Sequence, residues 1–110
     1  MKRREDPLGS LEHIVLLATM RLGPGAYGMT VRREIESATG RDISIGAVYA
    51  TLVRLESKGL MRSHTGEPTA ERGGRAKRYF RTTAEGEAAV RSTHEILQKM
   101  SAGLKGLQPT

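Results

Sequence analysis

The stretch that decides the fold is SIGAVYATLVRLESKGL, residues 44 to 60. Ser44 suits a helix N-cap, because its hydroxyl can accept a hydrogen bond from a free backbone N–H of the first turn, and Gly59 suits the end of the helix. The apolar residues on one face are Ile45, Val48, Leu52 and Leu55. Most residues of the opposite face are small, and that face consists of Gly46, Ala47, Ala50, Val53, Arg54 and Ser57, with Tyr49 on its flank. The stretch therefore predicts a helix from Ser44 to Lys58 with one side for a core and one side for a partner.

Two further helical patterns precede this stretch. The first runs from Ser10, its expected N-cap, to Leu22, and its apolar face is wide enough to predict burial by its own domain and by a second subunit. That face consists of Leu11, Ile14, Val15, Ala18 and Leu22, widened by Leu16, Leu17 and Met20. The second pattern runs from about Gly28 to Thr39, where Gly40 follows, and its apolar stripe is Val31, Ile35 and Ala38.

The short connection around Gly40 joins two helices, the second of which has small residues outside. This arrangement is typical of a helix-turn-helix whose second helix enters the major groove of DNA. The small side chains permit a close approach to base edges and phosphates, while Arg54 can reach guanine or phosphate and Tyr49 offers a hydroxyl. The alternative is that the small residues contact another helix.

The chain that follows predicts a β-hairpin, with strands from Leu60 to His64 and from Lys77 to Thr82 and a loop that contains Pro68, Gly73 and Gly74. Residues 72 to 81, RGGRAKRYFR, hold five basic residues and no acid. Behind a helix-turn-helix, such a hairpin is typical of a wing that neutralises phosphates or enters a minor groove. The alternative is that these charges form a solvent-exposed face that binds nothing. Tyr79 and Phe80 point to opposite sides of their strand, so we expect at least one of them to pack on the core.

The last helical pattern begins at Thr82 or Thr83, either of which can cap it, and runs to about Gly103; Thr82 would form a capping box with Glu85. Its apolar seam follows a heptad spacing through Val90, Thr93, Leu97, Met100, Leu104 and Leu107. About two and a half heptads are too few for an independent coiled coil, so the seam needs a second surface. We expect a symmetric homodimer in which this helix packs on its twofold mate and on the partner's first helix. The alternative is a monomer whose seam folds back on its own domain.

Composition limits the classes of function. The chain has 110 residues, a net charge of +6 and no cysteine, which excludes a multidomain enzyme, disulfides, thiol catalysis and cysteine-based metal sites. Residues 41 to 81 hold nine basic and four acidic residues, so an anionic partner is expected to dock there. His13, His64 and His94 fall on three different elements, and no phosphate-binding loop follows a strand. We therefore expect no metal, no other cofactor and no enzymatic activity.

Nothing in the sequence predicts a membrane segment. The longest purely apolar run is Ile14 to Ala18, whereas a helix that crosses a bilayer needs roughly 20 apolar residues. The basic residues 2 to 4 are not followed by the apolar core of a signal peptide. We expect a cytoplasmic protein.

The run from Leu8 to Gly86 resembles the PadR family of winged-helix transcriptional regulators. The resemblance rests on LGSLEHIVLLATMRLGPGAYGMTVRREIE, SIGAVYATLVRLESKGL and GEPTAERGGRAKRYFRTTAEG. The family's recognition helix typically reads Ser-x-Gly-x-x-Tyr-Pro, with Arg-Leu-Glu and Gly-Leu later, and the matching residues are Ser44, Gly46, Tyr49, Arg54, Leu55, Glu56, Gly59 and Leu60. Ala50 stands where proline is frequent, which leaves the contacts of that position open.

The resemblance implies three further properties. Tyr27 and Gly28 would begin the helix-turn-helix near the phosphate backbone, and the final helix would mediate a dimer. Some members of the family are repressors that small aromatic or cationic ligands release from DNA by binding near the dimer interface. This chain has no aromatic residue after Phe80, so a pocket here would be aliphatic and would take a small hydrophobic effector.

Together these patterns predict a mainly α fold with a small β-hairpin. The expected divisions are a flexible arm at 1–9, a winged helix-turn-helix at 10–83, a dimerisation helix at 84–105 and a frayed tail at 106–110. The residues expected to bind duplex DNA are Tyr27, Gly28, Ser44, Gly46, Ala47, Tyr49, Ala50, Arg54, Arg72, Arg75, Lys77 and Arg78. The residues expected to form the dimer interface or an effector pocket are Leu11, Val15, Val90, Ile96, Leu97, Met100 and Leu104.

The expected function is that of a sequence-specific transcriptional regulator, a repressor that binds an inverted repeat as a homodimer. The alternative is a winged helix that binds protein or RNA without operator specificity. The positive excess of residues 41 to 81 disfavours a pure protein contact. We expect no exposed aromatic residues around the basic patch, which disfavours stacking on single-stranded RNA.

Overall fold

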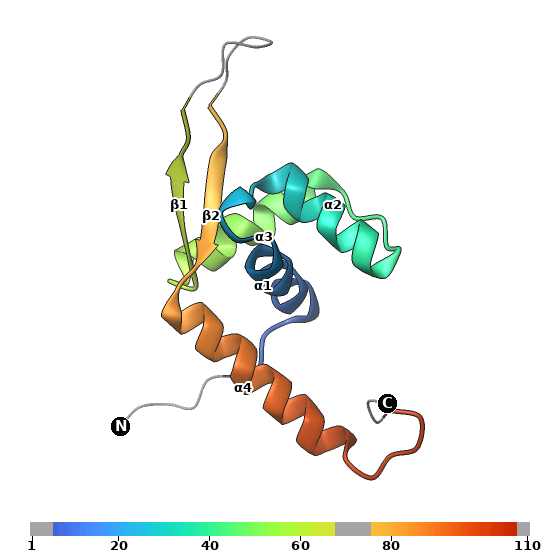
Figure 1. Cartoon of the computed structure of the whole chain (residues 1–110). Helices are drawn as coiled ribbons and strands as arrows, with labels where there is room; N and C mark the ends of the chain where they lie inside the picture. Colours follow the sequence, from blue (N-terminus) through green and yellow to red (C-terminus); the bar gives the residue numbers. More distant parts are fainter. Residues whose placement is uncertain (1–5, 68–75, 108–110) are drawn as a thin grey trace, which may run out of the picture.

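A computed structural model of the chain describes residues 6–67 and 76–107. Three helices, α1 (Ser10–Leu22), α2 (Gly28–Thr39) and α3 (Ile45–Ser57), precede the antiparallel strands β1 (Met61–Thr65) and β2 (Arg78–Thr82). A single 3₁₀ turn, η1 (Gly23–Gly25), separates α1 from α2, and α4 (Ala84–Ser101) follows the hairpin. Figure 1 shows the hairpin rising on one side of the helices while α4 extends away from its foot. The mainly α fold with a small β-hairpin is confirmed.

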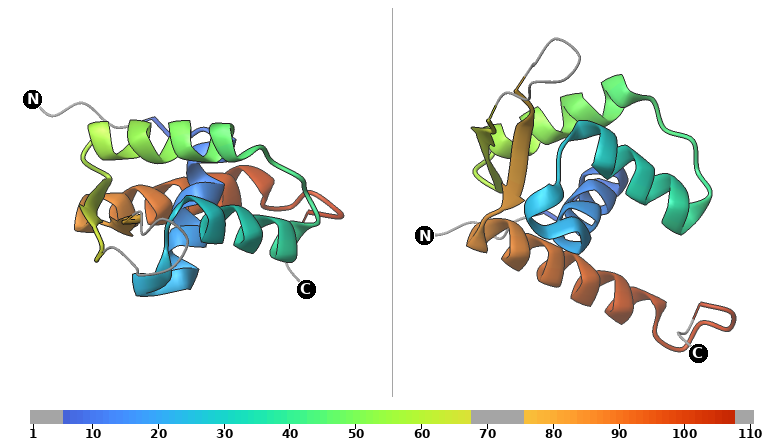
Figure 2. Two further views of the ribbon diagram at one scale, coloured as in Figure 1. Left: turned by 90° about the horizontal axis from the view of Figure 1, so that it is seen from above. Right: turned by 45° about the horizontal axis from the view of Figure 1, so that its top comes forward.

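Helix α1 is the centre of the domain, because it contacts α2, α3, α4 and β2. Figure 2 shows α1 crossing between α4 and the other two helices. The buried apolar core that results draws on every helix and both strands, and its larger members are Val15, Leu16, Val31, Ile35, Val48, Leu52, Leu55, Met61, Phe80 and Val90. Phe80 is buried whereas its neighbour Tyr79 is half-buried, as the strand alternation predicts.

The helix-turn-helix forms as the sequence indicates. The Ser44 hydroxyl accepts a hydrogen bond from the Ala47 N–H at 3.1 Å, and Gly40 ends α2 with a left-handed φ of +74° that favours glycine. Arg32 fixes the connection by donating from Nε to the Ile43 carbonyl at 2.7 Å. The caps and this contact fix the connection between α2 and α3, whose buried faces share the core.

Four local expectations are wrong. Gly9, not Ser10, is the N-cap of α1, and no side chain caps that helix. Ala38 and Ile45, expected on the core-facing sides, are exposed, because they lie at helix ends that extend beyond the core. The capping box of Thr82 with Glu85 does not form, because Thr83, the other expected cap, is the N-cap of α4 and accepts a hydrogen bond from the Gly86 N–H at 3.0 Å. The strands and α4 also differ from their expected bounds by one or two residues at their ends.

The foot of the hairpin is packed closely against the start of α4. A Cβ at Gly86 would lie 2.2 Å from the Leu60 carbonyl oxygen, so only glycine fits there. The Thr83 N–H donates to the same carbonyl at 3.1 Å. Further along, the Leu8 N–H donates to the Thr93 hydroxyl at 3.0 Å, which ties the segment before α1 to α4. The first half of α4 is therefore part of the domain.

The described segments of the chain contain no helix that is long and apolar enough to cross a membrane.

Candidate nucleic-acid interface

The outward face of α3 presents the residues that the sequence predicts. Gly46, Ala50 and Arg54 are exposed, Ala47 is half-buried, and 41% of the Tyr49 surface is accessible. Arg54 has no hydrogen-bond or ion-pair partner within residues 6–67 and 76–107, so its guanidinium is available to an external group. A backbone flanked by such small side chains can approach a groove closely.

The start of α2 lies beside the start of α3. A Cβ at Gly28 would lie 3.4 Å from Ile45 Cδ1 and 3.9 Å from Tyr49 Cδ1, so the two helix starts form one surface. Tyr27 precedes α2 and donates its N–H to the Thr30 hydroxyl at 2.9 Å. The structure therefore brings Tyr27 and Gly28 together with the first turn of α3.

The hairpin is attached to this surface through aromatic rings and backbone bonds. The Phe80 N–H donates to the Ala26 carbonyl at 2.9 Å, and Tyr27 pairs with Tyr79 in an isolated bridge. The Tyr27 and Tyr79 rings meet edge to face with centroids 5.4 Å apart, and His64 stacks on Tyr79 at 5.7 Å. These contacts fix the base of the wing relative to α2.

Exposed and half-buried rings therefore accompany the basic residues, contrary to the expectation from the sequence. The Lys77 ammonium lies 5.3 Å from the centroid of the Tyr27 ring, and Tyr49 is largely accessible. Lys77 lies with the Tyr27 ring on one face of the hairpin, and Arg78 lies with Tyr49 on the other. Aromatic residues are therefore present beside the basic ones, and their expected absence no longer disfavours single-stranded RNA.

Arg78 is exposed, with 42% of its side chain accessible, yet it is bonded to side chains of its own chain. Its Nε donates to Ser63 Oγ at 3.0 Å, one terminal nitrogen donates to the Tyr49 hydroxyl at 3.1 Å, and the other donates to Glu56 Oε1 at 2.5 Å. Its guanidinium also lies 5.2 Å from the centroid of the buried Phe80 ring. We call Tyr49, Glu56, Ser63 and Arg78 the clamp, because together they join α3 to both strands.

The contacts of the clamp stabilise the ionised forms of Glu56 and Arg78. The hydrogen bond from the Ser63 hydroxyl, followed by the charge of Arg78, lowers the pKa of Glu56 below its ordinary value. The hydrogen bond to the Tyr49 hydroxyl, followed by the charge of Glu56, raises the pKa of Arg78. Both side chains are therefore ionised at neutral pH, and the positive charge of Arg78 faces an adjacent carboxylate.

The other basic residues of the wing are only partly described. Lys77 is exposed at the beginning of the second strand, whereas Arg72 and Arg75 lie outside the described residues. The sequence did not indicate Glu56, Ser63 or His64 as site residues. Glu56 was visible only as part of the Arg-Leu-Glu match, and no spacing along the chain connects it with Arg78.

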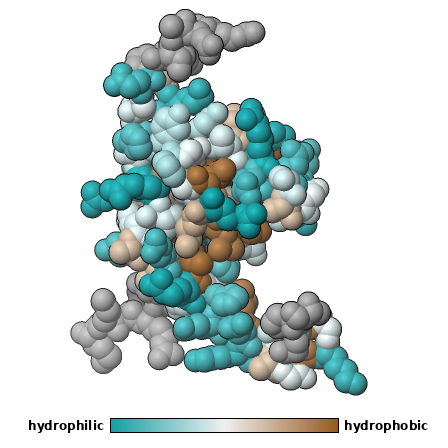
Figure 3. Space-filling model, in the orientation of Figure 1, coloured by the Kyte–Doolittle hydropathy of each residue, from teal (hydrophilic) through white to brown (hydrophobic). Residues whose placement is uncertain are grey.

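The residues expected to form a dimer interface or an effector pocket fall into two groups. Val15 and Val90 are buried in the core of the same chain, and Leu11 and Ile96 are half-buried. Among the exposed apolar residues are Leu17 and Met20 on α1, Leu97 and Met100 on α4, and Leu104 and Leu107 after α4. In Figure 3 apolar surface is visible over the centre of the molecule and again along α4.

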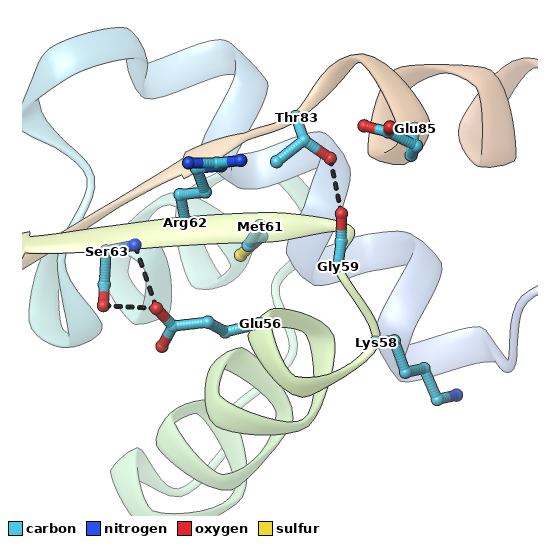
Figure 4. A pocket seen from close by; sticks show the side chains of 8 residues that line it. All are labelled: Glu56, Lys58, Gly59, Met61, Arg62, Ser63, Thr83 and Glu85. Atoms are coloured by element: carbon cyan, nitrogen blue, oxygen red, sulfur yellow. Dashed lines mark hydrogen bonds between the residues drawn. The ribbon is translucent and has the colours of Figure 1, made fainter.

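A depression of about 640 Å³ lies at the foot of the wing, on a different part of the surface. Figure 4 shows the eight residues that line it, among them Glu56 bonded to Ser63 and Thr83 bonded to the Gly59 carbonyl. Its lining is mostly polar and includes Lys58, Arg62 and Glu85, so it is not the aliphatic pocket that the sequence predicts. No group of His, Asp or Glu residues that could hold a metal ion occurs in the described part of the chain.

Solved structures with the same arrangement support a common fold. A transcriptional regulator from Clostridium thermocellum is 25% identical, with a TM-score of 0.70, and the match covers 83% of this chain and 82% of that chain. A PadR family transcriptional regulator from Eggerthella lenta is 28% identical, with a TM-score of 0.65 and coverage of 82% and 76%. A winged-helix DNA-binding protein from STIV is 21% identical, with a TM-score of 0.64 and coverage of 83% and 90%. No curated protein matches the chain significantly.

The family model gives the clearest relationship. The model of the transcriptional regulator PadR-like family matches residues 16–92, which include the helix-turn-helix, the wing and the first half of α4. The match and the winged-helix arrangement agree with the resemblance on which the sequence analysis relied. This chain is a member of the PadR-like family of transcriptional regulators, with a winged-helix DNA-binding fold.

Proposed function

We propose that the chain represses transcription as a homodimer that binds an inverted repeat in duplex DNA, and that it acts by binding and not by catalysis. The observation that carries the proposal is the exposed face of α3. There the exposed Arg54, which has no partner among the described residues, and the accessible Tyr49 flank small residues on a helix that is capped by Ser44. The wing joins this face through the clamp, so the helix and the wing form one surface.

Duplex DNA suits this surface chemically. Arg54 can donate two hydrogen bonds to guanine. Gly46 and Ala50 are exposed and small, so the helix backbone can approach a base edge closely. Residues expected beside the phosphate backbone are Tyr27, Gly28, Ser44 and Ala47, with Lys77 and the wing arginines Arg72 and Arg75 adding positive charge.

The exposed apolar residues at the end of α4 support the dimer. Leu97 and Met100 on α4, and Leu104 just after the helix ends at Ser101, are more than half exposed, and within residues 6–67 and 76–107 nothing covers them. A twofold axis through this seam gives each half-site of the DNA one recognition helix, with the half-sites about one helical turn apart. A small hydrophobic effector would act at the same seam by changing how the two α4 helices pack.

The experiment that tests the proposal is a selection from a pool of random duplex DNA by the purified chain. The expected result is the enrichment of an inverted repeat with half-sites about one turn apart. Binding of the enriched duplex is then challenged with scrambled duplex and with single-stranded RNA of equal length. Equal competition by scrambled duplex would rule out operator specificity, and preferential competition by RNA would favour the RNA-binding alternative.

A further inference from the structure

Arg78 is the most fully engaged basic side chain of the described wing. Three of its five N–H groups are bonded within the protein, and Phe80 lies against the face of its guanidinium. Its net charge is largely matched by Glu56, which also accepts two hydrogen bonds from Ser63. Such a side chain is fixed in place and contributes less free charge to a phosphate than its sequence position suggests.

The bond to Tyr49 determines what the Tyr49 hydroxyl can do. A phenol has one proton to donate and can also accept, and here the oxygen accepts from Arg78. The Tyr49 ring is fixed as well, because it meets the buried Phe80 ring edge to face at 6.3 Å. The phenolic proton is thereby left for an external acceptor, on a side chain that is 41% exposed beside the small residues of α3.

We infer that Arg78 is a positioning residue that holds Tyr49 as a hydrogen-bond donor toward the DNA. The inference rests on the proposed function and deepens it. In the major groove guanine, adenine and thymine offer acceptors, whereas the exposed group of cytosine is a donor. Tyr49 therefore disfavours cytosine at the base position that it faces, and Arg78 contributes to specificity through Tyr49 without contacting the base.

The conservative variant Arg78→Lys separates this role from a phosphate contact. Lysine keeps the positive charge but is a point donor that cannot reproduce the planar fork to Tyr49, Ser63 and Glu56. The experiment measures Kd by fluorescence anisotropy for the wild type, Arg78→Lys, Tyr49→Phe and the double variant. The duplexes are the selected operator and single-position cytosine variants of it, each at several salt concentrations. Arg81→Lys, on the same strand and exposed, is the matched control.

We expect Arg78→Lys and Tyr49→Phe each to weaken operator binding by about 2- to 10-fold. Both variants lose the discrimination against cytosine at the same position, and the double variant is no weaker than Tyr49→Phe alone. The slope of log Kd against log salt stays unchanged in Arg78→Lys, and Arg81→Lys binds like the wild type. Thermal melting checks that each variant is folded, and Tyr49→Phe, which removes one exposed hydroxyl, carries the specificity test if Arg78→Lys is destabilised.

Three results would overturn the inference. Wild-type affinity and specificity of Arg78→Lys would show that only the positive charge of this position matters, as at a phosphate contact. Multiplicative losses in the double variant show that Arg78 and Tyr49 act independently. Retained discrimination against cytosine in Tyr49→Phe removes the donor role. The proposed function is tested separately with the wild type alone. If the wild type does not bind its selected duplex more tightly than scrambled duplex, that function is contradicted before any variant is compared.

Discussion

The junction between α3 and the wing differs sharply from the far half of α4. At the junction, Arg78 bonds three side chains from two other elements, and Phe80 is buried beneath it. In the far half of α4, Leu97 and Met100 are exposed, the latter by 74%. The first region is complete within one chain and leaves small and polar groups outside. The second region leaves apolar groups outside, so it needs another apolar surface.

Gly86 lies between these two regions, where the first turn of α4 packs on the foot of the hairpin, and changing it is expected to have the largest effect. A Cβ there would overlap the Leu60 carbonyl oxygen, so Gly86→Ala must move either the hairpin or α4. We expect a loss of about 3 kcal/mol in the free energy of unfolding, measured with urea. Gly46→Ala is the control, because a Cβ at Gly46 meets open space. Equal stability of the two variants would contradict the close packing of the hairpin foot on the start of α4.

The open seam of α4 can be broken without touching the junction. Leu97→Asp places a charge among exposed apolar residues, so we expect the dimer to dissociate into monomers at micromolar concentration, as measured by light scattering. Operator binding is lost with it although every basic residue remains. The control is Gln98→Asp, which adds the same charge at an exposed position outside the seam. A wild-type chain that is already monomeric would contradict the proposed dimer.

The wing gives a smaller and purely electrostatic effect. Lys77→Ala is expected to flatten the plot of log affinity against log salt by about one unit, because one phosphate contact is lost. The same expectation applies to Arg72 and Arg75. Arg91→Ala, an exposed change on α4, is expected to leave the slope unchanged. A wild-type slope for Lys77→Ala would mean that its ammonium serves only the Tyr27 ring.

The smallest expected effect is on acid sensitivity, to which His13 on α1 and Glu56 at the junction contribute in different pH ranges. Burial, and then the charge of His94, lowers the pKa of His13 below 6.5, so the folded state binds its proton less readily than the unfolded state. Stability is therefore lost as the pH falls below about 6.5. The pKa of Glu56 is lowered instead by hydrogen bonds and charge, and its contribution is present above about 4.5 and lost as the pH falls through the folded-state pKa.

Urea unfolding between pH 8 and pH 3 measures both contributions. His13→Gln is expected to remove the part of the decline that begins near pH 6.5, and Glu56→Gln the part below about 4.5. Glu36→Gln, at an exposed position, is the control for the second variant. A decline that is unchanged in both variants would contradict the assignment.

The sequence predicted the elements better than their contacts. Capping serine, terminal glycines and apolar spacing placed α2 and α3 correctly, because these signals act within a few residues. The same local signals made Thr82 and Thr83 equally suitable as the N-cap of α4. Only the path of the chain from the hairpin into α4 decides between them. Ile45 lies on the same side of the α3 axis as the core residues, but it is in the first turn of the helix, which extends beyond the core.

The clamp was not predictable from the sequence in the same way. Glu56, Ser63 and Arg78 come from three elements and meet only after the hairpin has folded against α3. A basic run in the sequence gives the sign of the charge but not which of its members is bound internally. Arg78 was therefore expected to bind DNA like the other basic residues of the wing, although its side chain makes three hydrogen bonds within the protein.

The central claim is that the outward face of α3 reads duplex DNA. The most direct test compares Arg54→Ala with Arg91→Ala on the selected operator, since both variants remove one exposed arginine and only the first lies on that face. The account predicts that Arg54→Ala loses about 1–3 kcal/mol of binding free energy and discriminates less against mutated operator positions. Arg91→Ala should bind as the wild type does. Equal affinity and equal specificity of the two variants would contradict the claim.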